Sequence, residues 1–402
     1  MTQAHSVPML EFMLNRRLFV QGKLSLPFWG LAAATPARDF VQELGLRPFI
    51  NAAEPFTALS GGLLPREAAA AWEAMSAVNL RLEEVHDAVG KRIASLINAE
   101  AAMVTAGAAS ALTLGTAACI TGTNREFIRR LPDTTGMKNE VIIQKSHRYG
   151  YDHAVRNCGT RYVEVETREE LERAIGDRTA MLHFFNTNDP IGRIKAAEFA
   201  ELGKKHGIPT FNDIAADVPP ADNLSRFTRM GFDIVAVSGG KGMRGPQSCG
   251  LLFGRKELIA AARLNAPPNS DAIGRGQKVN KEEMVAMMVT LEVYLKRDHE
   301  ADWTEWERRL KLIAERAETV SGVRTERFMP EIHYRVPHLR IRWVESQVKI
   351  TPAEAARRLK EGEPSIELRP SAKDSIELSS WMLQPGEAEI VARRVRETLS
   401  HA

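Results

Sequence analysis

Short apolar runs alternate with helical patterns between residues 101 and 253, and this alternation constrains the fold more than any other feature of the chain. Runs of strand length begin at 101 and cover 141–144, 161–166, 180–185, 209–213, 233–237 and 250–253. Patterns typical of helices cover 168–175 and 196–206 and resume at 256. Strands that alternate with helices form a mostly parallel sheet covered on both faces, so we predict an α/β fold. Ligands of such sheets bind at the carboxyl ends of the strands.

The pattern changes on either side of this region. Residues 65–98 have helical spacing, with a predicted break around 85–87. A long charged helix is predicted from 281 to about 319, followed by short strands and two helices near 352–360 and 387–399. We therefore predict a large domain over 38–280, whose N-terminal segment contributes to the small domain or to a subunit contact. Residues 281–402 would form a helix and a small C-terminal α+β domain.

Residues 1–37 are interpreted separately. Residues 15–21, with Arg16 and Arg17, resemble a twin-arginine export signal, and a short apolar run ending in small residues follows. That run is too short for a permanent membrane span. A surface N-terminal arm explains the same residues equally well, so both a cytoplasmic and an exported protein stay open. No other segment is long and apolar enough to cross a membrane, and we expect no membrane association.

Composition excludes several classes of protein. The 402 residues carry a net charge of only +3, with 44% hydrophobic and 26% charged residues, which is ordinary for a globular enzyme. No basic patch interleaved with aromatic residues stands out, so no nucleic-acid partner is expected. The three cysteines are widely separated and form no CxxC pair. No histidines or cysteines have metal-ligand spacing, and we predict no metal site.

The strand at 233–237 ends in a glycine-rich turn with Lys241 in its middle. Residues 240–245 match the pattern GxGxxG, but a strand rather than a helix is predicted after them, which argues against a dinucleotide site. No Ser or Thr follows the lysine, so the turn is not a Walker loop. A pinned and partly desolvated lysine suits imine formation with a cofactor aldehyde. We interpret Lys241 as the anchor of pyridoxal phosphate, against the alternative of an exposed turn lysine.

A carboxylate at the end of another strand supports this interpretation. Asp213 ends the run 209–213, and a buried aspartate needs a cationic partner. A pyridinium N–H is such a partner, and the protonated ring withdraws electrons from a substrate α-carbon. Ala215 would pack under the ring. Asp217 competes for the role, and a helix cap or a structural salt bridge is the alternative for Asp213.

Further candidates surround this pair. Small residues at a helix start let backbone N–H groups approach an anion closely, which predicts a phosphate cup at Gly107, Ala108, Ala109 and Ser110; tight helix packing is the alternative. Ser238 would also bond the phosphate. His147 would stack on the cofactor ring, although a polar loop residue is its ordinary role. Arg369 is a candidate fork for a substrate carboxylate, against the default of a surface arginine.

Taken together, these residues resemble the fold-type I pyridoxal phosphate enzymes. More narrowly, they resemble the group that includes bacterial selenocysteine synthase and D-glucosaminate-6-phosphate ammonia-lyase. The resemblance runs from about Leu44 to the C-terminus. It is carried by residues 50–52, 57–62, 99–109, 147–153, 212–217, 238–247 and 274–283.

The resemblance implies homodimers or larger rings of dimers, in which Asn51, Thr57 and Gly61 face the site of the partner subunit. Residues 54–56 depart from the family, where glycine and small or polar residues are expected. The extra N-terminal RNA-binding domain of selenocysteine synthases is not recognised. Arg275 and Lys278 would meet an anionic substrate such as a phosphorylated sugar acid.

The reaction implied is α,β-elimination from a hydroxy amino acid or amino sugar acid, which gives a 2-oxo acid and ammonia. The open alternatives are a selenocysteine synthase-like transferase, an aminotransferase, desulfurase or aldolase of the same fold, and a non-catalytic protein that binds the cofactor.

Overall fold

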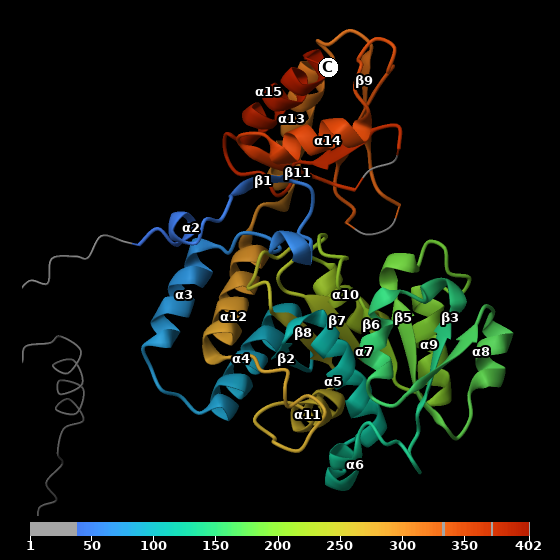
Figure 1. Cartoon of the computed structure of the whole chain (residues 1–402). Helices are drawn as coiled ribbons and strands as arrows, with labels where there is room; N and C mark the ends of the chain where they lie inside the picture. Colours follow the sequence, from blue (N-terminus) through green and yellow to red (C-terminus); the bar gives the residue numbers. More distant parts are fainter. Residues whose placement is uncertain (1–37, 332–333, 371–372, 402) are drawn as a thin grey trace, which may run out of the picture. The chain divides into compact units, whose positions relative to one another are not determined.

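The computed structural model describes residues 38–331, 334–370 and 373–401 (Figure 1). The predicted export signal or arm at 1–37 lies outside the described residues. The chain divides into two compact units, and the boundary follows Pro48. In the described part of the first unit, the short helix α2 (Phe40–Glu43) begins where the Asp39 side chain accepts a hydrogen bond of 3.1 Å from the backbone N–H of Gln42.

The second unit, from Phe49 onward, contains a sheet of seven strands in the order β2-β8-β7-β6-β5-β3-β4. The strands are β2 (Ala101–Thr105), β3 (Glu140–Gln144), β4 (Arg161–Val165), β5 (Thr179–Phe185), β6 (Thr210–Asp213), β7 (Ile234–Ser238) and β8 (Gly250–Gly254). Strands β3 to β7 pair in parallel, whereas β8 is antiparallel to both β7 and β2. The predicted α/β class and its mostly parallel sheet are confirmed.

Helices cover both faces of this sheet because successive strand residues point to opposite sides. On β7, Ile234 and Ala236 pack in the cluster that contains α5 and α11, whereas Val235 and Val237 pack with α4, α9, α10 and α12. The helices are α3 (Arg66–Ser76), α4 (Leu82–Ile97), α5 (Gly107–Thr121), α6 (Arg125–Arg130), α7 (His153–Arg156), α8 (Arg168–Ala174), α9 (Ala196–His206), α10 (Asn223–Met230), α11 (Lys256–Leu264) and α12 (Lys281–Lys296). Short 3-10 turns cover Thr57–Leu59, Lys145–His147, Gly150–Asp152 and Asn186–Asn188.

Two predicted helix boundaries are wrong. The helical region 65–98 breaks between α3 and α4, at residues 77–81, and not around 85–87. Val85 and His86 are buried on α4, so the turn that they occupy faces the core. The charged helix from 281 is two helices, α12 and α13 (His299–Ala317). The Asp298 side chain starts α13 by accepting hydrogen bonds from the backbone N–H groups of Glu300 and Ala301.

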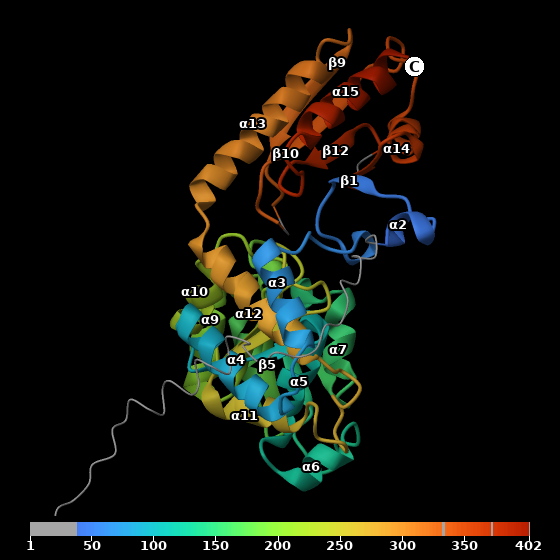
Figure 2. The ribbon, with the colours of Figure 1, turned by 90° about the vertical axis from the view of Figure 1, so that its left-hand side faces the viewer.

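The remaining elements form a module around a second core, which we call the C-terminal module. Its strands are β1 (Phe49–Ala52), β9 (Val323–Phe328), β10 (His338–Trp343), β11 (Ser365–Leu368) and β12 (Ile376–Ser379), and its helices are α13, α14 (Pro352–Glu361) and α15 (Glu387–Ser400). Helices α13 and α15 lie side by side (Figure 2), over the antiparallel sheet β12-β10-β9. Strand β1 pairs in parallel with β11, so a segment from the N-terminal part of the chain completes the module.

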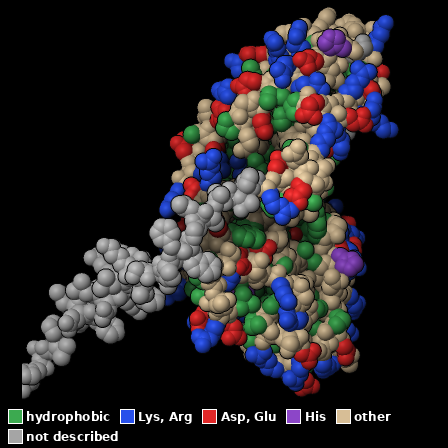
Figure 3. All heavy atoms as spheres, turned by 60° about the vertical axis from the view of Figure 1, so that its left-hand side comes forward, with side chains coloured by type: hydrophobic (Ala, Val, Ile, Leu, Met, Phe, Trp, Pro, Cys, Tyr) green, Lys and Arg blue, Asp and Glu red, His purple; other side chains and the backbone are tan. Residues whose placement is uncertain are grey.

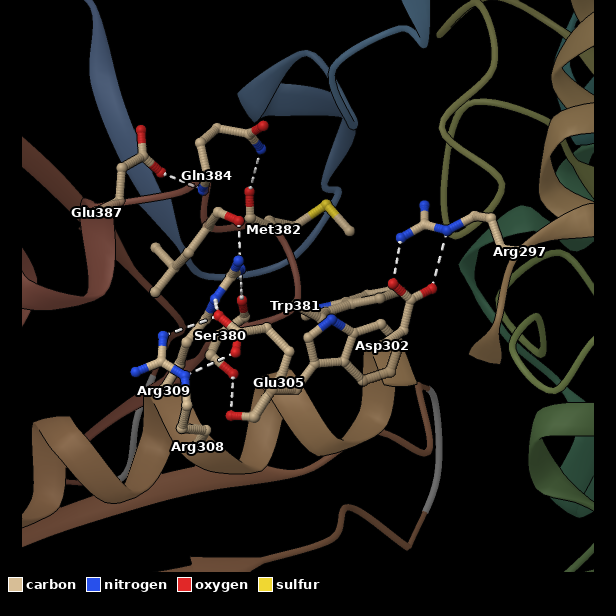
Figure 4. Close-up of polar contacts among 12 residues, drawn as sticks. Arg297, Asp302, Glu305, Arg308, Arg309, Ser380, Trp381, Met382, Gln384 and Glu387 are labelled. Atoms are coloured by element: carbon tan, nitrogen blue, oxygen red, sulfur yellow. Dashed lines mark hydrogen bonds and ion pairs between the residues drawn. The ribbon is translucent and has the colours of Figure 1, made fainter. Parts of the chain in front are cut away.

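Polar contacts join α12, α13 and the turn after β12 (Figure 4). Arg297 and Asp302 form a bidentate ion pair of 2.7 and 2.8 Å across the junction of the two helices. Farther along α13, Arg309 donates to the carbonyl of Leu383 at 2.6 Å. Arg244, which follows Lys241 by three residues, donates to the carbonyl of Trp381. The turn after β12 is therefore hydrogen-bonded both to α13 and to residues 239–247, which carry Lys241 and which we call the lysine loop.

On the face drawn in Figure 3, Lys and Arg side chains are interspersed with Asp and Glu side chains. Within the described ranges, no helix combines the length and the apolar character needed to cross a bilayer.

Candidate active site

A cavity of about 620 Å³ opens beyond the carboxyl ends of β6 and β7. Its walls come from both the sheet and the C-terminal module. They include Glu54, Pro55, Phe56, Thr57, Gly107, Ala108, Ala109, Tyr149, Tyr151, Phe185, Asp213, Ala215, Ser238, Lys241, Ser248, Tyr334 and Arg369. Residues from eight stretches of sequence thus line one space.

Lys241 and Asp213 both line this cavity. Asp213 is the last residue of β6 and pairs with Ala236 on β7, and Lys241 follows the end of β7 by three residues. Burial raises the pKa of Asp213, while hydrogen bonds from Tyr149 and the backbone N–H of Ala215 and the charge of Lys241 lower it. Burial lowers the pKa of Lys241, and the nearby carboxylates raise it. The lysine is therefore suited to act as a nucleophile.

Glycine is required around the lysine because the loop packs against other backbone. A Cβ at Gly240 would lie 2.5 Å from the Cα of Gln247, and one at Gly242 would overlap the carbonyl of Val218. The loop is also bonded across its base, since the N–H of Gly239 donates to the carbonyl of Cys249 at 2.9 Å. These contacts fix the backbone that carries Lys241.

The predicted phosphate cup lies at the first turn of α5. Gly107, Ala108 and Ala109 line the cavity, and Gly107 has a φ of +76°. Among the residues that the structure describes, no side chain caps this helix, and its first turn contains no acidic residue. The N–H groups of the first turn therefore remain available to an anion, which fits a phosphate.

Two serines differ in their placement relative to the cup. Ser238 lines the cavity, and its predicted bond to the phosphate stays a prediction. Ser110 lies outside the lining, and its hydroxyl donates to Oε1 of Gln277 at 2.7 Å. Ser110 therefore supports the loop near residue 277 and does not face the anion site with its side chain.

His147 is not placed to stack on a ring in the cavity. It is fully buried and packs edge-on against Phe184. Its Nδ1 accepts a hydrogen bond from the N–H of Phe185, and its Nε2 lies 3.2 Å from the side-chain nitrogen of Gln144. Burial lowers its pKa to about 4, so the imidazole is neutral. The predicted stacking role of His147 is corrected: Tyr149, two residues later, lines the cavity instead.

Tyr149 is a candidate site residue that the sequence did not predict. Its hydroxyl donates to Oδ2 of Asp213, and its ring stacks on Phe185 with centroids 3.9 Å apart. The backbone N–H of Ala215 donates to the other oxygen of Asp213 at 2.9 Å. The carboxylate is thus held by a donor on each oxygen.

Arg369 lines the cavity, but it is already paired with acids. Its Nε lies 3.4 Å from Oε1 of Glu54, and its guanidinium lies 3.5 Å from Oε2 of Glu377. A substrate carboxylate would therefore share this arginine with Glu54. Glu54 is the first residue of the segment that departs from the family pattern, and that departure was the only sequence signal for it.

The other predicted substrate residues are spread around the site. Thr57 lines the cavity. Asn51 does not; it shapes the turn after β1 by accepting from the N–H of Ala53 at 3.0 Å and donating to the carbonyl of Glu54. Arg275 and Lys278 also lie outside the lining, and Lys278 is exposed. Their predicted roles toward a substrate stay predictions.

Comparison with known proteins bears on this site. The chain is similar to D-glucosaminate-6-phosphate ammonia lyase of Salmonella typhimurium, with 27% identity over 90% of this chain and 99% of that protein. A solved structure of D-glucosaminate-6-phosphate ammonia-lyase matches with a TM-score of 0.80 at 27% identity, over 91% of this chain and 99% of that one.

Two further proteins are similar to the chain, one in sequence and one in fold alone. The 5'-C-glycyluridine monooxygenase-decarboxylase of a Streptomyces species is 28% identical over 89% of this chain and 91% of that protein. A Sphingomonas wittichii serine palmitoyltransferase shares the fold, with a TM-score of 0.54 at 11% identity over 88% of this chain and 87% of that one.

The family model described as L-seryl-tRNA selenium transferase (SelA) matches residues 67–393, which include the lysine loop, the strand that ends in Asp213 and the first turn of α5. This match covers most of the chain and confirms the predicted resemblance, so the chain belongs to the SelA family.

Proposed function

We propose that this protein is a pyridoxal phosphate-dependent lyase. It would catalyse α,β-elimination from a hydroxy amino acid or an amino sugar acid and give a 2-oxo acid and ammonia. The observation that carries the proposal is that Lys241, Asp213 and the uncapped start of α5 line one cavity. The similarity to an ammonia lyase over nearly the whole chain supports the reaction class.

The cofactor's parts match the residues present. Lys241 would hold the aldehyde carbon, and Asp213 would accept the ring N–H. The first turn of α5, with Ser238, would hold the phosphate. When bound, pyridoxal phosphate supplies a protonated ring that accepts electrons from the substrate α-carbon.

The protein's own groups then have distinct tasks. The lowered pKa of Lys241 suits removal of the α-proton by its Nζ. Arg369 orients the substrate carboxylate. Tyr149 and the N–H of Ala215 keep the Asp213 carboxylate in place. Walls formed by Phe56, Phe185 and other apolar residues exclude water from the reacting atoms.

We further propose that the active unit is a homodimer or a ring of dimers, in which Asn51, Thr57, Arg275 and Lys278 contribute to substrate binding across subunits. Lys241 and Arg369 are the basic residues among the described residues that line the cavity. A phosphate on the substrate, in addition to that of the cofactor, would therefore be bound by Arg275 and Lys278. Light scattering of the purified protein that gave a monomer would contradict this assembly.

The proposal is tested with purified protein loaded with pyridoxal phosphate. A panel of D- and L-serine, D- and L-threonine, D-glucosaminate and its 6-phosphate is scored for ammonia and 2-oxo acid. We expect release of both without an added keto acid, and none from Lys241→Ala, which should also lose the absorbance of the covalently held cofactor. Retention of that absorbance in Lys241→Ala would refute the assignment.

The same panel separates the alternatives. Turnover that requires a keto-acid co-substrate would identify an aminotransferase. Oxygen uptake with release of carbon dioxide would favour chemistry like that named for the Streptomyces relative. A bound cofactor with no turnover would favour a non-catalytic protein.

A further inference from the structure

Glu54 and His338 form a buried pair at the wall of the cavity. The side chain of Glu54 is 2% exposed and that of His338 is 0% exposed, and Nε2 of the histidine lies 2.9 Å from Oε1 of the glutamate. Glu54 follows β1 and His338 begins β10, so the C-terminal module brings the two together. Of the pair, only Glu54 lines the cavity.

Hydrogen-bond geometry determines how many protons this pair holds. Nδ1 of His338 lies 2.8 Å from the carbonyl oxygen of Val336, which only accepts, so Nδ1 carries a hydrogen. The contact between Nε2 and Glu54 then needs one more proton between the two atoms. That proton belongs either to an imidazolium or to a carboxylic acid. The pair therefore stores one proton that can be transferred.

The second oxygen of Glu54 is available to a ligand. Among the described residues, no hydrogen bond to Oε2 is found. Oε2 is also not one of the fully enclosed polar atoms without a partner, so part of its surface is accessible. Arg369 and His338 both contact Oε1. Because χ3 of glutamate is broad and two-fold, a half turn of the carboxyl exchanges its oxygens and presents the stored proton to the cavity.

We propose that Glu54 is the general acid that protonates the leaving β-hydroxyl group, and that His338 is the positioning residue that supplies and orients its proton. This inference rests on the proposed elimination. Hydroxide is a poor leaving group, since water has a pKa of about 15.7, so cleavage of the Cβ–O bond needs a proton on the oxygen. Lys241 removes the α-proton, and Glu54 is a separate group that lines the same cavity.

The step balances without a further reactant. Lys241 Nζ takes the α-proton, and the electrons of the Cα–H bond form the Cα–Cβ double bond. The Cβ–O bond breaks with its electrons on oxygen, which takes the proton of Glu54 and leaves as water. Glu54 ends as a carboxylate beside a neutral His338 protonated on Nδ1. The protein holds as many protons as before, and one proton passed from Lys241 through solvent to the pair resets the site.

Leaving-group replacement tests the proposal. The probes are serine and β-chloroalanine of the enantiomer that the loaded wild-type protein accepts, because chloride leaves without a proton. For Glu54→Gln we expect kcat on serine to fall by about 10²- to 10⁴-fold, the usual contribution of a general acid. On β-chloroalanine, kcat of Glu54→Gln should fall by less than about threefold relative to the wild type, because chloride needs no general acid. The absorbance of the bound cofactor should not change.

Matched variants separate protonation from binding. Glu377→Gln removes the other acid beside Arg369, and Glu377 lies outside the cavity lining, so the serine-to-chloroalanine ratio should stay that of the wild type. His338→Gln should lower this ratio and alter the pH profile of kcat on serine alone. Glu54→Asp should restore part of the loss, and it replaces Glu54→Gln if that variant does not fold.

The outcomes are distinct. Equal losses on both probes in Glu54→Gln would show a binding or structural role and overturn the inference. A wild-type protein that releases chloride but no ammonia from any hydroxy amino acid would also overturn it, while elimination itself stands. A wild-type protein inactive on all probes would overturn the proposed function and this inference with it.

Discussion

Replacing Tyr149 by phenylalanine removes one hydroxyl and tests whether the hold on Asp213 matters to the site. The hydroxyl donates to Oδ2 of Asp213, and the ring stacks on Phe185 at 3.9 Å between centroids. Phenylalanine keeps the stacking and the volume. The perturbation is therefore the loss of one donor to a buried carboxylate that is 1% exposed.

The size of the effect follows from that bond. A hydrogen bond to a charged group contributes about 1.5–3 kcal/mol, which corresponds to about 10- to 100-fold in an equilibrium or rate constant. The bond from Tyr149 also lowers the pKa of Asp213, which burial raises. Its loss raises that pKa further, so the ionised carboxylate that the cofactor ring requires persists only at higher pH.

The assay measures cofactor affinity and kcat/KM against pH. We expect Tyr149→Phe to weaken both by about 10- to 100-fold and to move the acid limb of the affinity profile to higher pH. Tyr162→Phe is the matched control, because its hydroxyl bonds Nδ1 of His183 at 2.7 Å and it lies outside the cavity lining. An unchanged acid limb in Tyr149→Phe, with affinity like that of the control, would refute the reasoning.

Two predictions concern stability. A Cβ at Gly250 would lie 2.6 Å from the N of Ala108, so Gly250→Ala should cost about 1–3 kcal/mol in urea unfolding and weaken cofactor binding; unchanged unfolding would contradict this. The pKa of Asp217 is raised from 3.8 to about 7, first by burial. The stabilisation from its proton, up to about 4 kcal/mol, is therefore full below about pH 4 and is lost as the pH rises through 7. The stability of Asp217→Asn in the cofactor-free protein should exceed that of the wild type increasingly from about pH 4 to about pH 7 and level off above, and parallel stability profiles would refute the sign.

Periodicity predicted the sheet because strand and helix spacing are local properties of the chain. The alternation from 101 to 253 gave the α/β class, and the structure bears it out with seven strands. Boundaries were less predictable. The split of the helix after 281 depends on Asp298, which starts α13, and a capping residue inside a charged stretch resembles any other surface acid.

The site was predictable where one residue type has few other uses. A lysine in a glycine turn and an aspartate at a strand end are of this kind, and both line the cavity. The sequence alone did not show whether the ring of His147 or that of Tyr149 faces the cavity. Each follows β3 within five residues, and only packing against Phe184 and Phe185 determines which ring faces the cavity.

The sequence by itself determined the fold class, the family and the lysine–aspartate pair, because these depend on short stretches whose spacing carries the information. The tertiary structure alone decided which other groups meet them. Glu54 and His338 are 284 residues apart and touch only because β1 joins the module that contains β10. Contacts between distant segments depend on how whole elements pack, and no local pattern records them.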